Sequence, residues 1–202
     1  MTRKNRKQQI MLAAEKCFTS QQFHEIRLDD IARRARVGKG TIYLYFKNKD
    51  DLFFQTALSG FEQLCRLLAR SVSEKASFLE NLLTACGQIN RFFEKRHELF
   101  RMMNEEDVRL CFSRGNIRER WLKKRKLLVA AVAAIMRKGF TEGRIRKDIL
   151  PEVLADFFLG MLRTRLRDLE DAPRTMRRDS LIVDLFCNGA TNEHTKEHRR
   201  SH

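Results

Sequence analysis

The stretch RLDDIARRARVGKGTIYLYFKNK, from Arg27 to Lys49, decides the fold of this chain. Apolar residues at helical spacing predict one helix over residues 28–35 and a second, short helix over residues 39–45. A tight turn joins them, and Asn48 is the expected N-cap of a longer third helix. Asp50 and Asp51 in the first turn of that helix suit the positive end of its dipole. The stretch therefore predicts a helix, a turn, a short helix and then a long helix.

The short second helix carries residue types that suit a DNA groove better than a protein core. Glycines keep its backbone open to close approach, Lys39 and Thr41 can reach base edges, and tyrosine hydroxyls can donate to phosphates. Two alternatives stay open: the three helices can pack together without touching DNA, and Tyr43 or Tyr45 can be partly core. We expect a helix-turn-helix element at about residues 27–46, with DNA contacts from Arg27, Gly38, Lys39, Gly40, Thr41, Tyr43, Leu44, Tyr45 and Lys49.

Four segments carry a resemblance to a known family: AAEKCF at residues 13–18, DDIARRA at 29–35, RVGKGTIYLYF at 36–46 and NKDDLF at 48–53. In this order they resemble the N-terminal domain of TetR-family transcriptional regulators, over about residues 3–64. The resemblance implies a basic first helix, a helix-turn-helix and a long connecting helix. It also implies a sequence-specific DNA-binding repressor that a small-molecule effector releases from its operator.

Three positions depart from the family pattern. Arg36 stands where the family usually has a glycine in the turn, which predicts an arginine with a positive φ. Gly38 and Arg27 stand where the family has hydroxyl residues that cap the two helices, and each lost cap costs about 1 kcal/mol. Arg27 keeps a positive charge that can still bind phosphate.

Helical spacing continues along the rest of the chain, without the sustained alternation that predicts strands. We expect an all-α protein with a helix-turn-helix domain at residues 4–64, joined by the long helix to an effector-binding and dimerisation domain at 65–190. Pro151 and Pro173 are each expected to open a helix. The polar residues 191–202 predict a disordered tail. A metal site in this tail, built from His194, His198 and His202, stays the alternative.

The charge of the chain points to a polyanionic partner. The 202 residues carry 41 Lys and Arg against 26 Asp and Glu, a net charge of +15. Residues 1–50 hold 12 of these cations and 5 acidic residues, so this segment can track a phosphate backbone. The alternative function is that of a basic helical protein that binds DNA or a membrane surface without specificity. The simplest alternative is a basic but otherwise ordinary protein.

Other functions find little support in the sequence. The five cysteines are odd in number and widely spaced, which favours free thiols in the cytoplasm over disulfides. No signal peptide or stretch of transmembrane length stands out, so no membrane partner is expected. We find no nucleophile elbow, metal-ligand cluster, phosphate loop or paired carboxylates, and we expect neither an enzyme nor a cofactor.

The effector site is implied by the resemblance, and the sequence offers only candidates for it. Aromatic residues and methionines at helical spacing can line such a pocket, although they more often form core. Lys124 shares an apolar helical face, where snorkelling to solvent is the simpler explanation. Residues 114–147 hold 12 cations and 2 acidic residues, so the effector is expected to be anionic or amphipathic. The candidates are Phe93, Phe100, Met103, Phe112, Trp121, Lys124 and Phe157.

The dimer is implied by the resemblance as well, through the last two helices. Two apolar stripes there can form a four-helix interface with a second copy, or can pack only within the monomer. A homodimer would read a palindromic operator in double-stranded DNA. The expected interface residues are Leu154, Phe158, Gly160, Met161, Leu162, Leu181, Ile182, Leu185 and Phe186.

Overall fold

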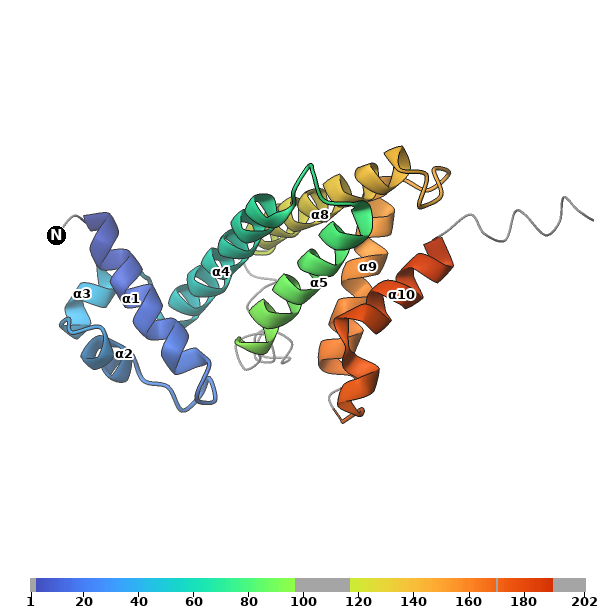
Figure 1. Cartoon of the computed structure of the whole chain (residues 1–202). Coiled ribbons are helices and arrows are strands. Elements are labelled where there is room, and N and C mark those ends of the chain that lie inside the picture. The colour runs from blue at the N-terminus through green and yellow to red at the C-terminus, as the bar shows by residue number, and fades with distance from the viewer. Residues whose placement is uncertain (1–2, 97–116, 170, 191–202) are drawn as a thin grey trace, which may run out of the picture. The chain divides into compact units, whose positions relative to one another are not determined.

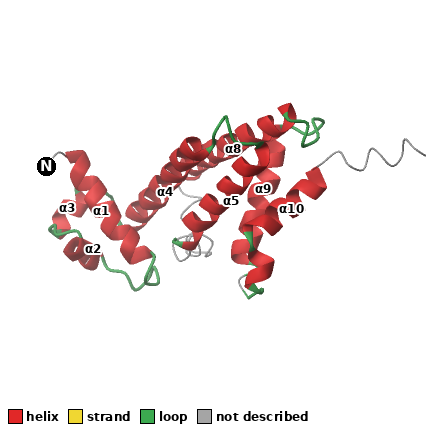
Figure 2. Cartoon of the chain, viewed as in Figure 1, coloured by secondary structure: helices red, strands yellow, loops and turns green. Residues whose placement is uncertain are grey.

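The computed structural model describes residues 3–96, 117–169 and 171–190, and within these ranges it contains helices and no strand (Figures 1 and 2). The all-α prediction is confirmed. The helices are α1 (Arg3–Phe18), α2 (Leu28–Arg34), α3 (Lys39–Tyr43), α4 (Lys49–Ser71), α5 (Phe78–Glu94), α8 (Ile117–Thr141), α9 (Pro151–Arg167), the 3-10 helix η1 (Arg174–Arg177) and α10 (Asp179–Ala190).

The chain forms two compact units. The first unit comprises Met1–Gln63 and Phe93–Lys124, and the second unit comprises Leu64–Phe92 and Arg125–His202. All three boundaries between the units fall inside helices, so α4, α5 and α8 each contribute residues to both units. The functional division at residues 4–64 and 65–190 stays a prediction. The predicted tail at residues 191–202, with its three histidines, lies outside the described residues.

The first unit is built on an aromatic and aliphatic core that fixes α1, α2 and α3 together. Ile10, Phe18, Ile31 and Ile42 are fully buried there. The rings of Phe18 and Phe53 meet edge to face with centroids 5.0 Å apart. Each such side chain contributes about 1.5–3 kcal/mol when it is fully buried, so the position of the short α3 is set by packing and not by its own length.

The predicted start of α4 is confirmed in detail. The Asp51 backbone N–H donates to Asn48 Oδ1 at 2.8 Å, as an N-cap requires. The Asp51 carboxylate in turn accepts the Lys47 N–H at 3.0 Å. These two bonds fix the angle at which the chain enters α4.

The second unit packs α5, the later part of α8, α9 and α10 around one core. Phe158 and Phe186 meet edge to face at 5.2 Å and hold α9 on α10. Gly139 is required by close packing, because a Cβ at this position would lie 2.9 Å from the Phe78 ring. No helix among the described residues has both the length and the apolar character needed to cross a bilayer.

The two prolines behave differently from each other. Pro151 occupies the first turn of α9, as predicted. Pro173 opens only the 3-10 helix η1, so the prediction that it starts the last helix is wrong. The physical reason is Arg178, whose extended backbone (ψ 144°) interrupts the helix and whose carbonyl then accepts the first N–H groups of α10.

Candidate nucleic-acid interface

The turn between α2 and α3 contains an arginine in a left-handed conformation. Arg36 has φ 52°, and it is the one non-glycine residue with a positive φ in the described part of the chain. The predicted positive φ is therefore confirmed. This conformation costs about 1–2 kcal/mol for an L-residue. The Val37 N–H donates to the Ala32 carbonyl at 3.0 Å across the turn, and the Arg36 side chain stays exposed beside α3.

The helix α2 begins at Arg27, which sits where a hydroxyl cap would otherwise lie. The Asp30 carboxylate accepts the Arg27 N–H at 3.3 Å, so half of a capping arrangement is present. The Arg27 side chain makes no capping hydrogen bond and is exposed. It is therefore available to phosphate, as its charge suggested.

The helix α3 presents one face to the core and the other to solvent. Ile42 is fully buried and anchors the inner face. The Tyr43 side chain is 53% exposed and Leu44 is 71% exposed. A Cβ at Gly40 would meet nothing within 4 Å, so nothing in the chain covers this position. We define the outer face of α3 as Lys39, Gly40, Tyr43 and Leu44, which the structure brings together as predicted site residues.

Gly38, Thr41 and Tyr45 border the outer face and are placed differently. Gly38 is the N-cap residue of α3 without a side-chain hydrogen bond, as expected for glycine. Thr41 is half-buried. Tyr45 is half-buried too and packs on the core of the first unit, so this tyrosine is the one that is partly core.

Lys39 is paired with an acidic residue in the DNA-free protein. Its Nζ lies 2.8 Å from Asp29 Oδ2, and about half of each side chain is exposed. This hydrogen bond and the charge of Asp29 raise the pKa of Lys39. Exposed pairs of this kind stabilise a protein only weakly, so a DNA phosphate or base can displace Asp29.

Lys49 has a different place from the one its sequence predicted. Its Nζ donates to the Phe23 carbonyl at 2.8 Å and to the Ile26 carbonyl at 3.0 Å, and it lies 4.4 Å from the centre of the Phe23 ring. Burial lowers the pKa of this ammonium group. Lys49 therefore fastens the first turn of α4 to the loop between α1 and α2, and the DNA contact predicted for it stays a prediction.

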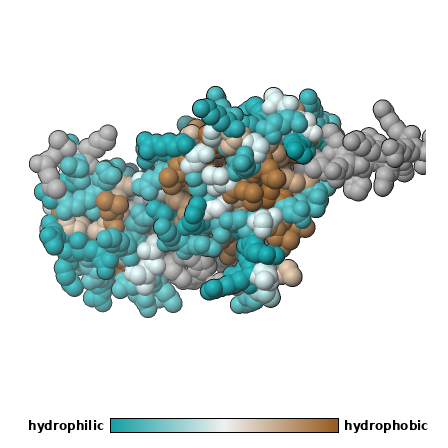
Figure 3. All heavy atoms as spheres, in the orientation of Figure 1, coloured by the Kyte–Doolittle hydropathy of each residue, from teal (hydrophilic) through white to brown (hydrophobic). Residues whose placement is uncertain are grey.

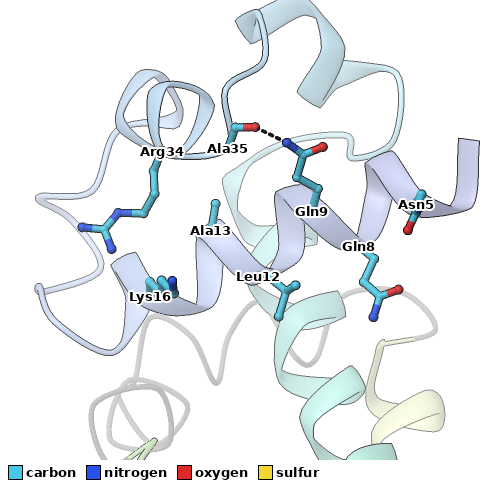
Figure 4. Close-up of a pocket in the computed structure, with 8 residues that line it drawn as sticks. All are labelled: Asn5, Gln8, Gln9, Leu12, Ala13, Lys16, Arg34 and Ala35. Atoms are coloured by element: carbon cyan, nitrogen blue, oxygen red, sulfur yellow. Dashed lines mark hydrogen bonds between the residues drawn. The ribbon is translucent and has the colours of Figure 1, made fainter. Parts of the chain in front are cut away.

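A groove of about 420 Å³, lined by both polar and apolar residues, lies between α1 and the end of α2 (Figure 4). Gln9 lines the groove and donates to the Ala35 carbonyl at 2.7 Å, and Lys16 and Arg34 line it as well. None of the predicted effector residues lines this groove. The Gln9 hydrogen bond holds α1 to Ala35, the residue that precedes the turn.

Two of the predicted effector residues contact Phe61 of α4, and a third pairs with the next residue, Glu62, all within the first unit. The Phe61 ring meets Trp121 at 4.4 Å and Phe93 at 6.1 Å, both edge to face. Trp121 also packs against the core that holds the helix-turn-helix. Lys124 is paired with Glu62, which accounts for a lysine on an apolar face. Phe100, Met103 and Phe112 lie outside the described residues.

The predicted dimer residues divide into buried and exposed sets. The buried set belongs to the core within one chain, and its place in a dimer interface stays a prediction: Leu154, Phe158, Leu162, Ile182 and Phe186. Leu185 is 53% exposed, and Gly160, Met161 and Leu181 are half-buried. Phe157, predicted to line the effector pocket, is 64% exposed on α9 and so belongs to this outer surface instead.

Sequence reasoning missed two exposed positions on this outer surface and one contact in the first unit. Leu150 and Val153 are 68% and 40% exposed and continue the line of Phe157 along α9. Their spacing of three and four residues was a readable signal. The Arg96 guanidinium pairs with Glu15 of α1 at 2.6 Å, and no local pattern predicts a contact over so long a sequence separation.

A short helix that stands outward beside a tight turn, with exposed cations around it, defines a DNA-binding protein of the helix-turn-helix class. Residues 10–56 match the family described as "Bacterial regulatory proteins, tetR family". Residues 10–56 therefore form a DNA-binding domain of the TetR family, and the chain is a DNA-binding transcriptional regulator.

The relatives agree with this assignment. The chain is 28% identical over 184 residues to the uncharacterized HTH-type transcriptional regulator YhgD of Bacillus subtilis, covering 90% of this chain and 94% of YhgD. It is 26% identical over 186 residues to an HTH-type transcriptional repressor of Mycobacterium tuberculosis, covering 91% of each. FadR from Bacillus subtilis, solved in complex with stearoyl-CoA, shares the fold with a TM-score of 0.73 at 20% identity, over 90% of this chain and 98% of FadR.

Proposed function

We propose that this regulator is a homodimeric repressor that binds a palindromic operator and leaves it when a small-molecule effector binds. The observation that carries the proposal is the outer face of α3, which stands free on a helix anchored by Ile42. Two exposed cations flank this helix in the chain: Arg36 precedes it and Lys47 follows it. A short helix with a polar outer face and flanking cations fits the major groove and the phosphates beside it.

The proposed dimer is supported by an apolar surface without a partner in the single chain. Val153, Phe157 and Leu185 are each at least 40% exposed, and Figure 3 shows hydrophobic residues gathered over α9 and α10. A contiguous apolar patch of this kind usually marks an interface. Two copies related by a twofold axis would each supply one α3 to successive major grooves.

The proposed effector is anionic with an apolar body, of the fatty acyl class. Support comes from the excess of cations in residues 114–147 and from FadR, the relative in fold that was solved with stearoyl-CoA. The relative from Mycobacterium tuberculosis is named a repressor, which supports the proposed direction of control. Effector binding would act through α4, whose first turn Lys49 and Asp51 fasten to the DNA-binding elements.

Selection of bound DNA from a random library, at near-physiological salt, tests the proposal. A repressor of this kind should enrich a palindrome with half-sites about one helical turn apart. Addition of an acyl-CoA should then release the purified operator. A flat selection from folded protein would instead favour the alternative, a basic helical protein that binds DNA or membrane surfaces without specificity.

A further inference from the structure

A buried polar cluster joins three helices and η1 inside the second unit. We name it the Arg165 cluster: Cys86 and Asn90 from α5, Arg165 from α9, Arg177 from η1 and Asp179 from the start of α10. The Arg165 side chain is only 2% exposed. Asp179 is 37% exposed, so the cluster reaches the surface of the unit at this carboxylate.

One edge of the Arg165 guanidinium is fully engaged. Its Nη1 donates to Asp179 Oδ1 at 2.8 Å and to the Arg177 carbonyl at 3.2 Å. The same Asp179 oxygen lies 3.5 Å from Asn90 Nδ2 and 3.6 Å from the Cys86 sulfur. Several donors therefore already surround this Asp179 oxygen.

The other edge of the guanidinium is unused. Arg165 Nε and Nη2 are shielded from solvent and have no hydrogen-bond partner within the described structure. Arg177 Nε is buried without a partner as well. The Nε–Nη2 edge of an arginine carries two parallel N–H groups, and this is the geometry that holds a carboxylate or phosphate with two hydrogen bonds.

The cluster also has more positive than negative charge. Among its five members, Arg165 and Arg177 each carry a positive charge and Asp179 carries the one negative charge; Arg165 bonds to the Asp179 carboxylate and to the Arg177 backbone carbonyl. Burial, followed by the neighbouring charge of Asp179, raises the pKa of Cys86 to about 12, so its thiol stays neutral. The helix α5 packs directly on the cluster, since a Cβ at Gly87 would lie 3.0 Å from Asp179 Oδ2. Buried cations require a compensating anion or hydrogen bonds, and this cluster leaves both incomplete.

We propose that the Nε–Nη2 edge of Arg165, supported by Arg177, binds an oxyanion, namely the carboxylate or phosphate of the effector. This inference rests on the proposed effector response. The site selects for charge and planar two-point contact, and the apolar body of the effector lies beyond it.

Calorimetric titration of the full chain without DNA tests the site with three probes: inorganic phosphate, decanoate and decanoyl-CoA. Arg165→Lys keeps a cation beside Asp179 but removes the two-donor edge. It should weaken binding about tenfold or more, the effect of losing a charged hydrogen bond. Arg163→Gln, on an exposed position of the same helix, is the matched control and should bind as wild type does. Arg177→Gln should weaken binding less and serves as a second variant should Arg165→Lys unfold.

The probes separate the sources of the anion. Arg165-dependent binding of decanoate supports a carboxylate ligand, and such binding of decanoyl-CoA or phosphate alone supports a phosphate ligand. Equal affinity in wild type and the Arg165 and Arg177 variants, or no binding of any probe to wild type, overturns the site. Operator binding is measured separately. If Arg165-dependent binding leaves operator affinity unchanged, the oxyanion site stands and the proposed effector response fails.

Discussion

Replacement of Lys49 by methionine distinguishes two roles for this residue. The sequence predicts a DNA contact, which for a cation at the start of a helix would be made to a phosphate, whereas the structure places the ammonium group on the carbonyls of Phe23 and Ile26, over the Phe23 ring. Methionine keeps the length and apolar body of the side chain and removes only the charge and the donors. The structural role therefore predicts a loss of stability, and the phosphate role predicts a loss of DNA affinity.

The magnitude follows from the contacts that are lost. A hydrogen bond from a charged donor contributes about 1.5–3 kcal/mol, and a partly exposed cation–π contact contributes about 0.5–1 kcal/mol. The burial that lowers the pKa of Lys49 offsets part of this sum, and the ammonium group is not wholly shielded from solvent. We expect a net loss of about 2 kcal/mol in the free energy of unfolding, which for a chain of this size lowers the melting temperature by about 4–8 °C.

The assay is thermal unfolding by circular dichroism, at one protein concentration because a dimer melts in a concentration-dependent way. Lys47→Met is the control, since Lys47 is exposed two residues earlier and should change stability by less than about 0.5 kcal/mol. The salt dependence of operator binding is measured on the same variants. Each phosphate contact contributes about 0.9 to the slope of log affinity against log salt.

Two results would refute the structural role of Lys49. The first is a Lys49→Met protein that melts together with wild type. The second is a fall of about one in the salt slope of this variant, which would show that the ammonium group neutralises a phosphate.

Four further predictions concern the interface, the dimer, the turn and one helix cap. Tyr43→Ala should weaken operator binding about tenfold in fluorescence anisotropy without changing the melting temperature, because its ring is 53% exposed; an unaltered affinity would remove Tyr43 from the site. Phe157→Lys should give monomers in sedimentation velocity while Leu83→Lys, at an exposed position of α5, leaves dimers; dimers from both would place the interface elsewhere. Arg36→Gly should raise the melting temperature by about 2–4 °C, by relief of about 1 kcal/mol of backbone strain, and lower DNA affinity through the lost cation; a lower melting temperature would count against the strain. Glu80→Gln should melt below wild type at neutral pH, because the Ser77 hydrogen bonds that lower the Glu80 pKa stabilise its ionised form; this stabilisation is lost as pH falls through the folded-state pKa, so a gap that persists in acid would contradict it.

The helix-turn-helix could be predicted from the sequence because its determinants are local. The capping role of Asn48 follows from residues within three positions, and the positive φ of Arg36 follows from the glycine that the resembled family usually has at this position of the turn. The burial of Ile42 follows from helical periodicity next to Tyr43 and Leu44, which face outward. The prediction of each of these features requires no knowledge of how segments far apart in the sequence pack together.

The apolar stripes of α9 and α10 show the limit of what a local sequence pattern can predict. A stripe more than one residue wide has two sides, and periodicity does not say which side meets the same chain and which meets another. Phe158 is fully buried against α10, while its neighbour Phe157 is 64% exposed. The sequence identified both as apolar residues of one helix, and only the tertiary structure separates the core side from the outer side.

The two lysines of the DNA-binding motif extend this argument to charge. Lys39 and Lys49 both match cationic positions of the family, and sequence alone assigns both to the DNA interface. Lys39 is paired with a single exposed carboxylate, which a phosphate can replace at little cost. Lys49 is held by two backbone carbonyls, and moving it to DNA would leave both carbonyls without their charged donor. A motif specifies where a cation stands in the chain; its availability to DNA depends on the partners that the fold has already supplied.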